Sequence, residues 1–405
     1  MAKVIVIGGG PAGMMAAIKA SEKHQVILVD GNEKLGKKLF ITGKGRCNVT
    51  NAKDISDFFD YIPTNPQFLY SSLYTFTNDD TINFFENLGV KLKVERGDRV
   101  FPNSNKSSDI IAAMKSKLLK QKVKIILNNK VKKIHSKDKN IECIQLEDDT
   151  KINGDYFVLC TGGASYPQTG STGAGFNFAK KLGHTIKDIK PSLVPLEMKE
   201  DWIKELQGLS LKNIELNIVN EKNKTVYKKL GEMLFTHFGI SGPIVLSASS
   251  LLNKDNFKAV INLKPALTEE QLDNRLQKDF SKYCNKDFKN SLNDLLPKKL
   301  IGKIIELSGI NPDKKVNSIT KKERKHLGYI LQNLTFNIKG KRPLSEAIVT
   351  SGGVDVLEID PSTMKSKKIN NLYFAGEVID VDGFTGGFNI QIALSTGYLA
   401  GMSIE

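Results

Sequence analysis

Short apolar runs that end at glycine turns mark the N-terminal part of the chain. Lys3–Ile7 (KVIVI) has the continuous hydrophobicity of a strand that is buried on both faces of a parallel sheet. The glycine turn Gly8–Gly13 follows directly, then an apolar helix at Met14–Lys23 and a second apolar strand at Gln25–Val29. This order predicts a strand–turn–helix–strand unit of an α/β fold.

A similar order returns near the C-terminus. Asn371–Ala375 is a short apolar run, Gly376 and Glu377 form its turn, and the glycine-rich passage Gly383–Gly387 leads into a helix at Asn389–Met402. We therefore expect a split Rossmann-like domain, built from the two ends of the chain, with everything else inserted or wrapped around it.

Strands and helices alternate in the first half of the chain. Gly31–Asn51 is a long loop without a helical period, residues 53–95 are mixed and helical, and Gly97–Pro102 is a turn. Further strands are expected at Val90–Val94, Val123–Asn128, Val131–His135, Ile141–Leu146 and Asp155–Cys160, and helices at Ser107–Lys120, with Ser and Asp caps, and Phe176–Leu182.

The pattern changes from Pro191 onward. Thr268–Asn333 is helical, rich in lysine and opens with a capping box at Thr268–Gln271, and Ala347–Thr350 is a strand beyond it. Alternating strands that predict an antiparallel β module lie around the helical segment at Leu193–Glu197, Leu211–Val219, Thr225–Lys229, Phe257–Leu263 and Leu334–Ile338.

The N-terminal glycine turn has the chemistry of a dinucleotide-phosphate site. Gly8 permits the tight turn, Gly10 lets the backbone approach a pyrophosphate, and Gly13 lets the helix pack against the strand. The free amides of the first helical turn and its positive dipole end attract phosphate. Asp30, at the end of the second strand, stands where a carboxylate accepts hydrogen bonds from the adenosine ribose.

The C-terminal motif supplies what the far end of a flavin requires. Asp380 or Asp382 can hydrogen-bond the ribityl chain, and the N-terminus of the last helix would place positive charge at the flavin N1–C2 edge. Together the motifs predict FAD. The expected cofactor-binding residues are Gly8, Gly10, Ala12, Gly13, Asp30, Lys38, Thr42, Arg46, Asn48, Thr161, Gly162, Gly163, Gly376, Glu377, Asp380, Gly386, Gly387, Phe388, Asn389 and Ile390.

Composition limits the other chemistry. The chain has 405 residues and four cysteines without a CxxC pair, so neither a zinc cluster nor a disulfide–flavin reductase mechanism is indicated, and no metal is expected. The N-terminus is a strand rather than a signal peptide, and no apolar run reaches membrane-spanning length. We expect an enzyme in the cytoplasm, with reduced thiols and no membrane partner.

The net charge of +15 allows two interpretations. It fits a polyanionic partner such as RNA, but only six of the 59 basic residues are arginine, and such a lysine excess is also typical of AT-rich coding bias. Arginines in a lysine-biased chain are better than average site candidates. Arg46, Arg99 and Arg342 lie in motif-like loops, whereas Arg275 and Arg324 lie in amphipathic helices that favour solvation.

These motifs carry a resemblance to a known family. The chain resembles the BaiN-like RdsA family of FAD-dependent oxidoreductases, also labelled an aminoacetone oxidase family. The matching segments are Val4–Ala17, Lys37–Asn51, Arg99–Ile110, Cys160–His184, Pro191–Glu197, Gly231–Pro243 and the block from Ala347 to Gly401. They cover nearly the whole chain in order, and the match is weakest over the helical segment.

The resemblance implies a three-part architecture and a class of reaction. It implies a split FAD-binding domain, an inserted β-barrel and a helical insert within the barrel. The expected boundaries are 1–190 and 347–405 for the FAD-binding domain, 191–266 and 334–346 for the barrel, and 267–333 for the insert. Members resemble reductases of activated C=C bonds that take hydride from NAD(P)H through flavin N5. Proposed substrates range from bile-acid enones to a uracil base in large-subunit ribosomal RNA.

Three hypotheses for function stay open at this point. The first is a reductase that forms dihydrouridine in ribosomal RNA, favoured by the positive charge. The second is a small-molecule flavin oxidoreductase, either an enone reductase or an amine oxidase, with an apolar pocket in the barrel. The third is a flavin-binding RNA module without turnover. For the proton that C=C reduction requires, the candidate donors are His237 and Cys47, with Tyr166 as a weaker option.

Overall fold

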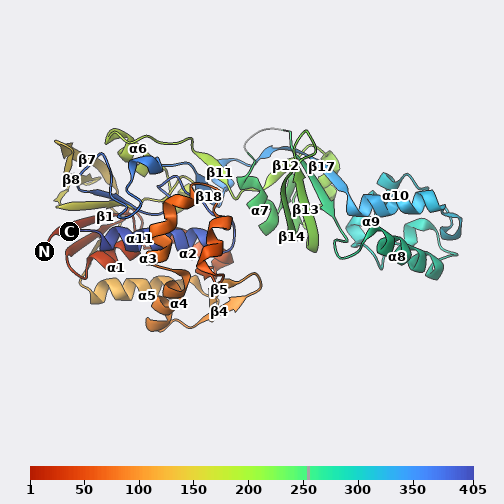
Figure 1. Cartoon of the computed structure of the whole chain (residues 1–405), viewed down its shortest axis with the longest axis horizontal. Coiled ribbons are helices and arrows are strands. Elements are labelled where there is room, and N and C mark those ends of the chain that lie inside the picture. The colour runs from red at the N-terminus through yellow and green to blue at the C-terminus, as the bar shows by residue number, and fades with distance from the viewer. Residues whose placement is uncertain (253–255) are drawn as a thin grey trace. The chain divides into compact units, whose positions relative to one another are not determined.

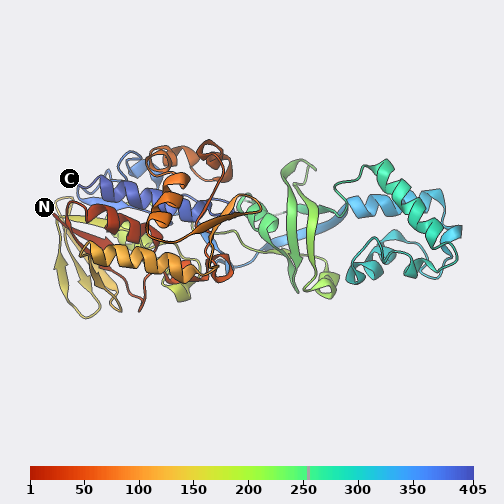
Figure 2. The ribbon, with the colours of Figure 1, turned by 90° about the horizontal axis from the view of Figure 1, so that it is seen from below.

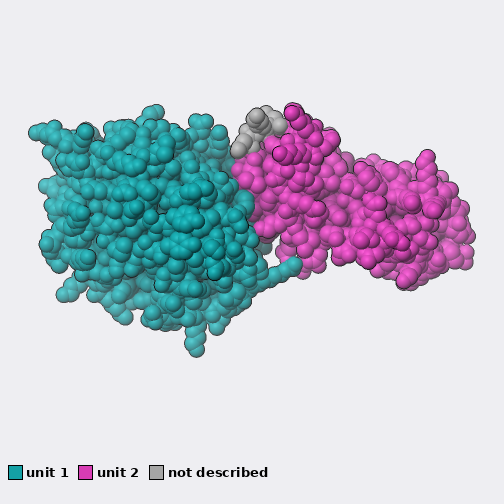
Figure 3. Space-filling model, in the orientation of Figure 1, with its two compact units in different colours: residues 1–192, 343–405 teal, residues 193–342 magenta. Residues whose placement is uncertain are grey.

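The protein is described by a computed structural model that covers residues 1–252 and 256–405. The chain divides into two compact units (Figure 3). Unit 1 comprises Met1–Ser192 and Pro343–Glu405, and unit 2 comprises Leu193–Arg342. Both ends of the chain therefore fold into the same unit, as the two glycine motifs predict.

A five-stranded parallel sheet forms the centre of unit 1 (Figure 1). Its strands, in spatial order, are β19 (Leu372–Phe374), β10 (Tyr156–Leu159), β1 (Lys3–Ile7), β2 (Gln25–Val29) and β6 (Lys124–Ile126). Every neighbouring pair is parallel. This arrangement explains the continuous hydrophobic runs, because a parallel sheet covered on both faces has no solvent side.

Helices α1 (Pro11–Ala20) and α11 (Phe388–Met402) lie side by side beside this sheet, with α5 (Ser107–Lys120) next to α1 (Figures 1 and 2). Small residues allow the close approach of α1 and α11. A Cβ atom built on Gly397 would overlap the carbonyl oxygen of Ala12, and one on Gly401 would overlap that of Ala16. The first and last helices of the chain are therefore packed backbone against backbone.

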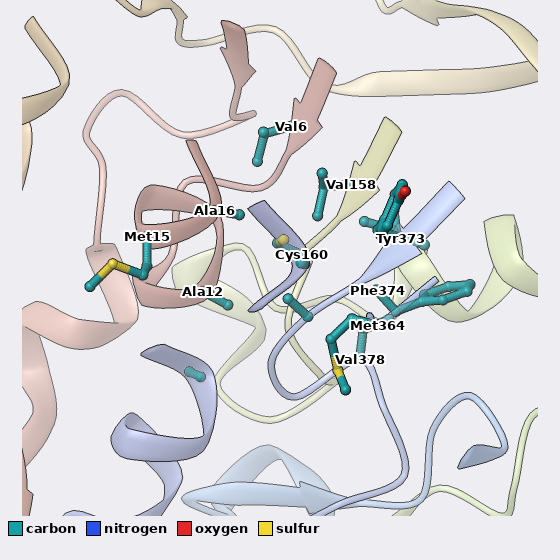
Figure 4. Close-up of a cluster of buried hydrophobic side chains, with 14 of the residues drawn as sticks. Val6, Ala12, Met15, Ala16, Val158, Cys160, Met364, Tyr373, Phe374 and Val378 are labelled. Atoms are coloured by element: carbon teal, nitrogen blue, oxygen red, sulfur yellow. The ribbon is translucent and has the colours of Figure 1, made fainter. Parts of the chain in front are cut away.

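Figure 4 shows the part of the core that joins these elements. Val6 of β1, Val158 of β10 and Phe374 of β19 are fully buried, and Ala12 packs beside Cys160 at their ends. The strand ends that carry the glycine motifs therefore rest on one continuous hydrophobic core.

Smaller elements surround the parallel sheet. Two three-stranded sheets consist of β3 (Thr50–Asn51), β5 (Arg99–Pro102) and β4 (Leu92–Glu95), and of β7 (Val131–Lys137), β8 (Asn140–Leu146) and β9 (Lys151–Asn153). Strand β11 (Lys190–Ser192) pairs with β18 (Val349–Ser351). The remaining helices are α2 (Lys37–Gly45), α3 (Tyr70–Thr75), α4 (Asn78–Asn87) and α6 (Ala174–Lys181).

Three sequence-based expectations for unit 1 are wrong in detail. The segment Gly31–Asn51 contains helix α2, which is kinked at Thr42, Gly43 and Lys44, where the backbone leaves the helical conformation. The expected turn at Gly97–Pro102 contains strand β5. Helix α5 has the expected bounds, but its N-cap is Lys106, which makes no side-chain capping bond.

Unit 2 contains a closed antiparallel barrel and a cluster of helices (Figure 1). The strands, in order around the barrel, are β12 (Leu196–Met198), β15 (Gly239–Ser241), β14 (Thr225–Phe235), β13 (Ser210–Val219), β16 (Lys258–Asn262) and β17 (Leu334–Lys341). Its interior is filled by side chains such as Leu216, Phe235 and Phe336, all fully buried. The expected α/β class with an antiparallel barrel is therefore confirmed.

Helix α7 (Pro243–Ser250) packs against β14, and three longer helices lie between β16 and β17. These are α8 (Glu269–Lys282), α9 (Lys298–Ser308) and α10 (Lys321–Gln332). The expected capping box is present, because Thr268 accepts a hydrogen bond from the Gln271 amide and donates its own amide to the Gln271 side chain.

Candidate functional site

The two glycine motifs come together at one edge of the parallel sheet. Gly8 lies against the Cys160 carbonyl, and a Cβ on Gly13 would overlap the Gly8 carbonyl oxygen. A Cβ on Gly376 would lie 2.8 Å from the Cβ of Ala12. The turns after β1, β10 and β19 therefore meet, and they bring together the N-terminal, central and C-terminal predicted residues.

Asp30 is held against the N-terminal turn. Its carboxylate accepts hydrogen bonds from the Gly9 amide at 2.6 Å and from the Asn32 amide at 2.7 Å. These two bonds use Oδ2 and Oδ1 respectively, so the carboxylate is fixed in orientation at the end of β2.

Gly10 differs from its neighbours. A Cβ built at Gly10 would meet no atom within 4 Å, whereas one at Gly8 or Gly13 would run into backbone. Gly10 is also the N-cap of α1, with Pro11 at the first helical position, so the helix begins at a turn whose outer side is open. This is the geometry in which backbone amides can approach an anion closely.

Lys38 and Glu377 join the α2 segment to the C-terminal motif. The Lys38 Nζ donates to both Glu377 oxygens, at 2.8 and 3.1 Å, and to Ser165 Oγ at 2.7 Å. Glu377 also accepts from the Thr350 amide at 2.8 Å. Both predicted residues are therefore engaged with protein groups, and the pair fixes four segments of unit 1 against one another.

The other predicted residues of the α2 segment lie close to the β4–β5 hairpin. Arg46 pairs with Glu95 at 3.0 Å and its guanidinium lies 4.1 Å from the centre of the Phe101 ring. Thr42 donates its hydroxyl to the Leu39 carbonyl. The amide oxygen of Asn48 is buried without a hydrogen-bond partner among the described residues.

The C-terminal passage is closed by Asn389. Its side chain accepts from the Gly383 amide at 2.8 Å and donates to the Gly383 carbonyl at 2.6 Å. Gly386 and Gly387 have φ of +136° and +102°, and Gly387 abuts Thr50. Phe388 is buried and stacks on Tyr61 with ring centres 4.6 Å apart, so its ring belongs to the core; Ile390 follows in the first turn of α11.

Asp380 is a buried acid of the C-terminal motif. Burial raises the pKa of its carboxyl, while a hydrogen bond from Asn65 at 3.1 Å acts in the opposite direction. Its neighbour Asp382 accepts a hydrogen bond from Ser192. Both carboxylates are therefore buried and hydrogen-bonded to other segments of unit 1.

These residues fit an FAD group. Thr161 Oγ1 and Asn48 Oδ1 are buried polar atoms without a partner in the described structure, and an unpaired buried polar atom costs about 1–3 kcal/mol. A ligand that bonds to both would remove that cost. The open side of Gly10 and the positive φ of Gly162, +70°, also suit a backbone that approaches phosphate and sugar oxygens.

The two leading proton-donor candidates differ in environment. Cys47 is fully buried, and burial raises the pKa of its thiol to about 12, so the thiol stays neutral at ordinary pH. His237 is exposed in unit 2, between β14 and β15, with its ring 4.9 Å from Phe238. The structure therefore places the two candidates in different units, and Tyr166 lies in unit 1 with φ of +53°.

The side chains of the other arginines named from the sequence also bond to protein groups. Arg342 pairs with Glu197 at 2.6 Å and lies over Phe238 at 4.5 Å, and Arg99 Nε donates to the Arg96 carbonyl at 2.9 Å. Arg324, expected to be solvated, instead forms a two-bond pair with Asp273 on α8. Arg275 pairs with Asp279 one helical turn away.

Some residues of the site were not found from the sequence. Ser165 and Thr350 complete the Lys38–Glu377 network, and Thr350 Oγ1 accepts from the Ala164 amide at 2.8 Å. The run of small residues after Gly163 did indicate this part of the site, because the backbone amides of such a turn need hydrogen-bond acceptors. Phe101 beneath Arg46 had no signal, since stacking across two segments leaves no sequence period.

Two properties of the described residues bear on partners. None of the helices in the described ranges has the length and apolarity that a membrane crossing requires. Among residues 1–252 and 256–405, no three His, Cys, Asp or Glu side chains are grouped as a metal site.

Known proteins match this chain over its whole length. Residues 2–403 match the family model described as HI0933-like protein Rossmann domain. A "3-dehydro-bile acid delta(4,6)-reductase" of Clostridium scindens is 30% identical over 99% of this chain and 98% of its own length. A "Ribosomal RNA dihydrouridine synthase" of Haemophilus influenzae is 32% identical, again over 99% and 98%.

A solved structure agrees on the fold. An open conformation of a flavocytochrome c3 fumarate reductase aligns with a TM-score of 0.53 at 16% identity, over 99% of this chain and 78% of that one. The likeness supports the Rossmann-type architecture, and the sequence matches decide the family. The chain belongs to the HI0933-like Rossmann-domain family, within the BaiN-like RdsA group of FAD-dependent oxidoreductases that its motifs predicted.

Proposed function

We propose that this FAD-dependent oxidoreductase reduces the activated C=C bond of a uridine in large-subunit ribosomal RNA to dihydrouridine, in the cytoplasm, with NAD(P)H as a transient hydride donor. Membership of an oxidoreductase family removes the ground for a flavin-binding module without turnover. The name of the Haemophilus influenzae relative supports an RNA substrate, and the name of the Clostridium scindens relative supports a small molecule. The charge distribution favours RNA.

The distribution of charge is the observation that carries the proposal. Unit 2 contains 27 of the 59 basic residues and 17 of the 44 acidic residues, so it holds +10 of the net +15 in 150 residues. Unit 1 holds only +5 in 255 residues. A positive field concentrated in one unit attracts a polyanion and orients it.

Helix α10 offers the best-defined part of that positive surface. Lys322, Lys325 and His326 are exposed and share a face with Tyr329, which is 61% exposed. In the described part of the chain, Lys322 and Lys325 are outside the ion pairs that neutralise many other lysines of unit 2. Lysines that bind phosphates, interleaved with an aromatic ring that can stack on a base, suit single-stranded RNA.

The residues of unit 1 would hold the cofactor. Amides at the start of α1, with Gly8, Gly10, Ala12 and Gly13, would bind the pyrophosphate, and Asp30 the ribose. The segments around Asn48, Thr161 and Asp380 would bind the flavin end, and the N-terminus of α11 would stabilise negative charge there. When bound, the flavin would supply the hydride that one carbon of the double bond accepts.

The second carbon requires a proton, and His237 is the preferred donor. Its imidazole is exposed and belongs to the basic unit, whereas the raised pKa and full burial of the Cys47 thiol suit a packing role. His237→Gln should lower the rate of reduction by about 10²-fold or more, with cofactor content unchanged. Cys47→Ala should leave the rate within a few-fold.

A small-molecule substrate is the second candidate, favoured by the match to the bile-acid reductase. The expected apolar pocket in the barrel finds no support in the packing, because the described interior positions are occupied by fully buried side chains such as Ile218 and Ile261. A steroid-sized substrate would have to bind outside the barrel core.

The decisive experiment tests the base itself. Deleting the gene and mapping reduced uridines in ribosomal RNA should show the loss of a dihydrouridine that the intact gene restores. An unchanged map would refute the RNA substrate. In parallel, NAD(P)H consumption by the purified enzyme with ribosomal RNA fragments or an unsaturated bile acid would separate the two candidates.

A binding measurement tests the charged surface. Lys322→Ala with Lys325→Ala should weaken RNA binding and reduce the slope of log K against log salt by about 1–2. The matched control is Lys289→Ala with Lys315→Ala, whose ammonium groups are paired with Asp313 and Asp287. If both double variants weaken binding equally, the α10 face has no special role.

A further inference from the structure

One segment of unit 1 has a net charge opposite in sign to that of the whole chain. From Asp54 to Val90 there is no lysine or arginine, although the whole chain has 59 such residues in 405. The segment carries six carboxylates, all on exposed residues: Asp54, Asp57, Asp60, Asp79, Asp80 and Glu86. This segment therefore has a net charge of −6 in a protein whose total is +15.

Three aromatic rings are stacked on the surface of the same segment. Phe59 lies on the 3₁₀ helix Ile55–Tyr61, and Tyr70 and Tyr74 lie one turn apart on α3. The ring centres of Phe59 and Tyr70 are 4.4 Å apart at 14°, and those of Tyr70 and Tyr74 are 5.7 Å apart at 24°. Tyr70 is 53% exposed and Tyr74 is 49% exposed.

The stack has a rigid support. Phe58, next to Phe59, is fully buried with its ring 5.0 Å from that of Phe388, and Tyr61, three residues further along the same 3₁₀ helix, stacks on Phe388 as well. Asp54 caps this helix through the Ser56 amide. The exposed rings therefore have a fixed orientation, so a partner would lose little entropy in ordering them.

Neither stability nor the proposed reaction accounts for this surface. Two half-exposed tyrosines forgo most of the burial that would make them stabilising. RNA is repelled by the six carboxylates, and the residues of the candidate flavin site do not include the stack. Tyr is enriched in protein interfaces, and it binds Lys and Arg through cation–π contacts that carboxylates nearby would strengthen.

We propose that the Phe59–Tyr70–Tyr74 stack, with the carboxylates of Asp57 and Asp60 beside Phe59, forms a docking surface for a lysine- and arginine-rich polypeptide segment. Guanidinium and ammonium groups lie over the exposed tyrosine faces, and Asp57 and Asp60, on the same 3₁₀ helix as Phe59, pair with the neighbouring charges. Charge complementarity selects this occupant, and it does so whether the substrate is RNA or a small molecule.

The test measures binding of a fluorescein-labelled twelve-residue peptide of alternating Arg and Ser by the full-length protein. Tyr70→Ala with Tyr74→Ala should weaken binding about tenfold or more, whereas Tyr70→Phe with Tyr74→Phe should bind within about threefold of the parent. Tyr329→Ala, at an exposed ring in basic unit 2, is the control and should leave peptide binding unchanged. Circular dichroism and flavin content verify that each variant is folded.

A charge arm completes the design. Asp57→Asn with Asp60→Asn should weaken binding of the peptide and reduce the salt dependence of that binding. Asp54 and Asp80 are left intact because both cap helices. Equal peptide binding by the alanine pair and the parent would overturn the proposal. Loss of RNA binding by the alanine pair would also overturn it, because the surface would then bind nucleic acid. Loss of a dimer in sedimentation would overturn it as well, because the occupant would then be a second copy of the chain.

Discussion

Gly397 is the position at which adding a single methyl group tests the close packing of α11 against α1. It lies inside α11, where an alanine would otherwise raise helix stability by about 1 kcal/mol. Its Cβ would overlap the Ala12 carbonyl oxygen and lie 3.0 and 3.1 Å from the Ala12 carbonyl carbon and Cα. These are backbone atoms, so no rotamer change can relieve the contact.

The expected cost follows from these two terms. Inserting a methyl group into a closely packed contact costs about 1–3 kcal/mol, and a rigid backbone places this site at the upper end. After subtracting the gain in helix propensity, we expect Gly397→Ala to destabilise unit 1 by about 2 kcal/mol. Because the displaced helix begins at the candidate flavin site, flavin should also dissociate more readily.

Gly302 provides the control. It lies in α9, is exposed, and a Cβ there meets no atom within 4 Å, so Gly302→Ala should stabilise unit 2 by about 1 kcal/mol. Trp202 is the only tryptophan, and Lys303 lies 4.6 Å from its ring, so tryptophan fluorescence in denaturant reports on this region. Circular dichroism and flavin release report on unit 1. If both alanines stabilise the protein, the backbone contact between α1 and α11 is not close.

Three further predictions concern charge and caps. Lys38→Met should reduce flavin content at purification and weaken FAD binding several-fold, because Glu377 loses its cation, whereas exposed Lys37→Met should bind FAD normally. Burial raises the pKa of the Cys47 thiol from 9 to about 12, so the unfolded chain loses this proton at a lower pH than the folded protein does. The contribution of the thiol to the free energy of unfolding is therefore full below about pH 9, and it falls by up to about 1.4 kcal/mol per pH unit as the pH rises towards 12. Cys47→Ala should therefore flatten the alkaline fall in Tm, and an unchanged fall would contradict this. Thr320→Ala should cost unit 2 about 1 kcal/mol in denaturant unfolding, because it removes the capping box of α10.

The sequence predicted the elements whose hydrophobic pattern is local. β1 and β2 have the expected bounds because each is a continuous apolar run, and α5 because its apolar positions repeat at helical spacing. Helix α2 was missed for a physical reason. Only Leu39 is buried, Phe40 is exposed, and Gly43 interrupts the helix, so no apolar period exists to be recognised.

Long-range pairing limited the remaining predictions. Strand β5 has four residues and forms because Val100 pairs with Thr50 on one side and Val94 on the other. No local period reports such partners. In the site, sequence spacing identified Lys38 and Glu377 separately, 339 residues apart, but could not show that each is the other's partner. Helix α7 did have a local signal, since Pro243 follows Gly242 at its start.

The arrangement of charge also bears on whether coding bias explains the lysine excess. A bias that acts on every codon would spread lysine evenly over the exposed surface. Instead the segment from Asp54 to Val90 has none, while unit 2 holds two thirds of the net charge in little more than a third of the residues. Burial alone does not explain the lack of lysine in the segment, because its six carboxylates are all on exposed residues. Bias can supply the lysines, but it cannot place them. The acidic segment of unit 1 and the basic excess of unit 2 therefore fit the two partners of opposite charge that we propose.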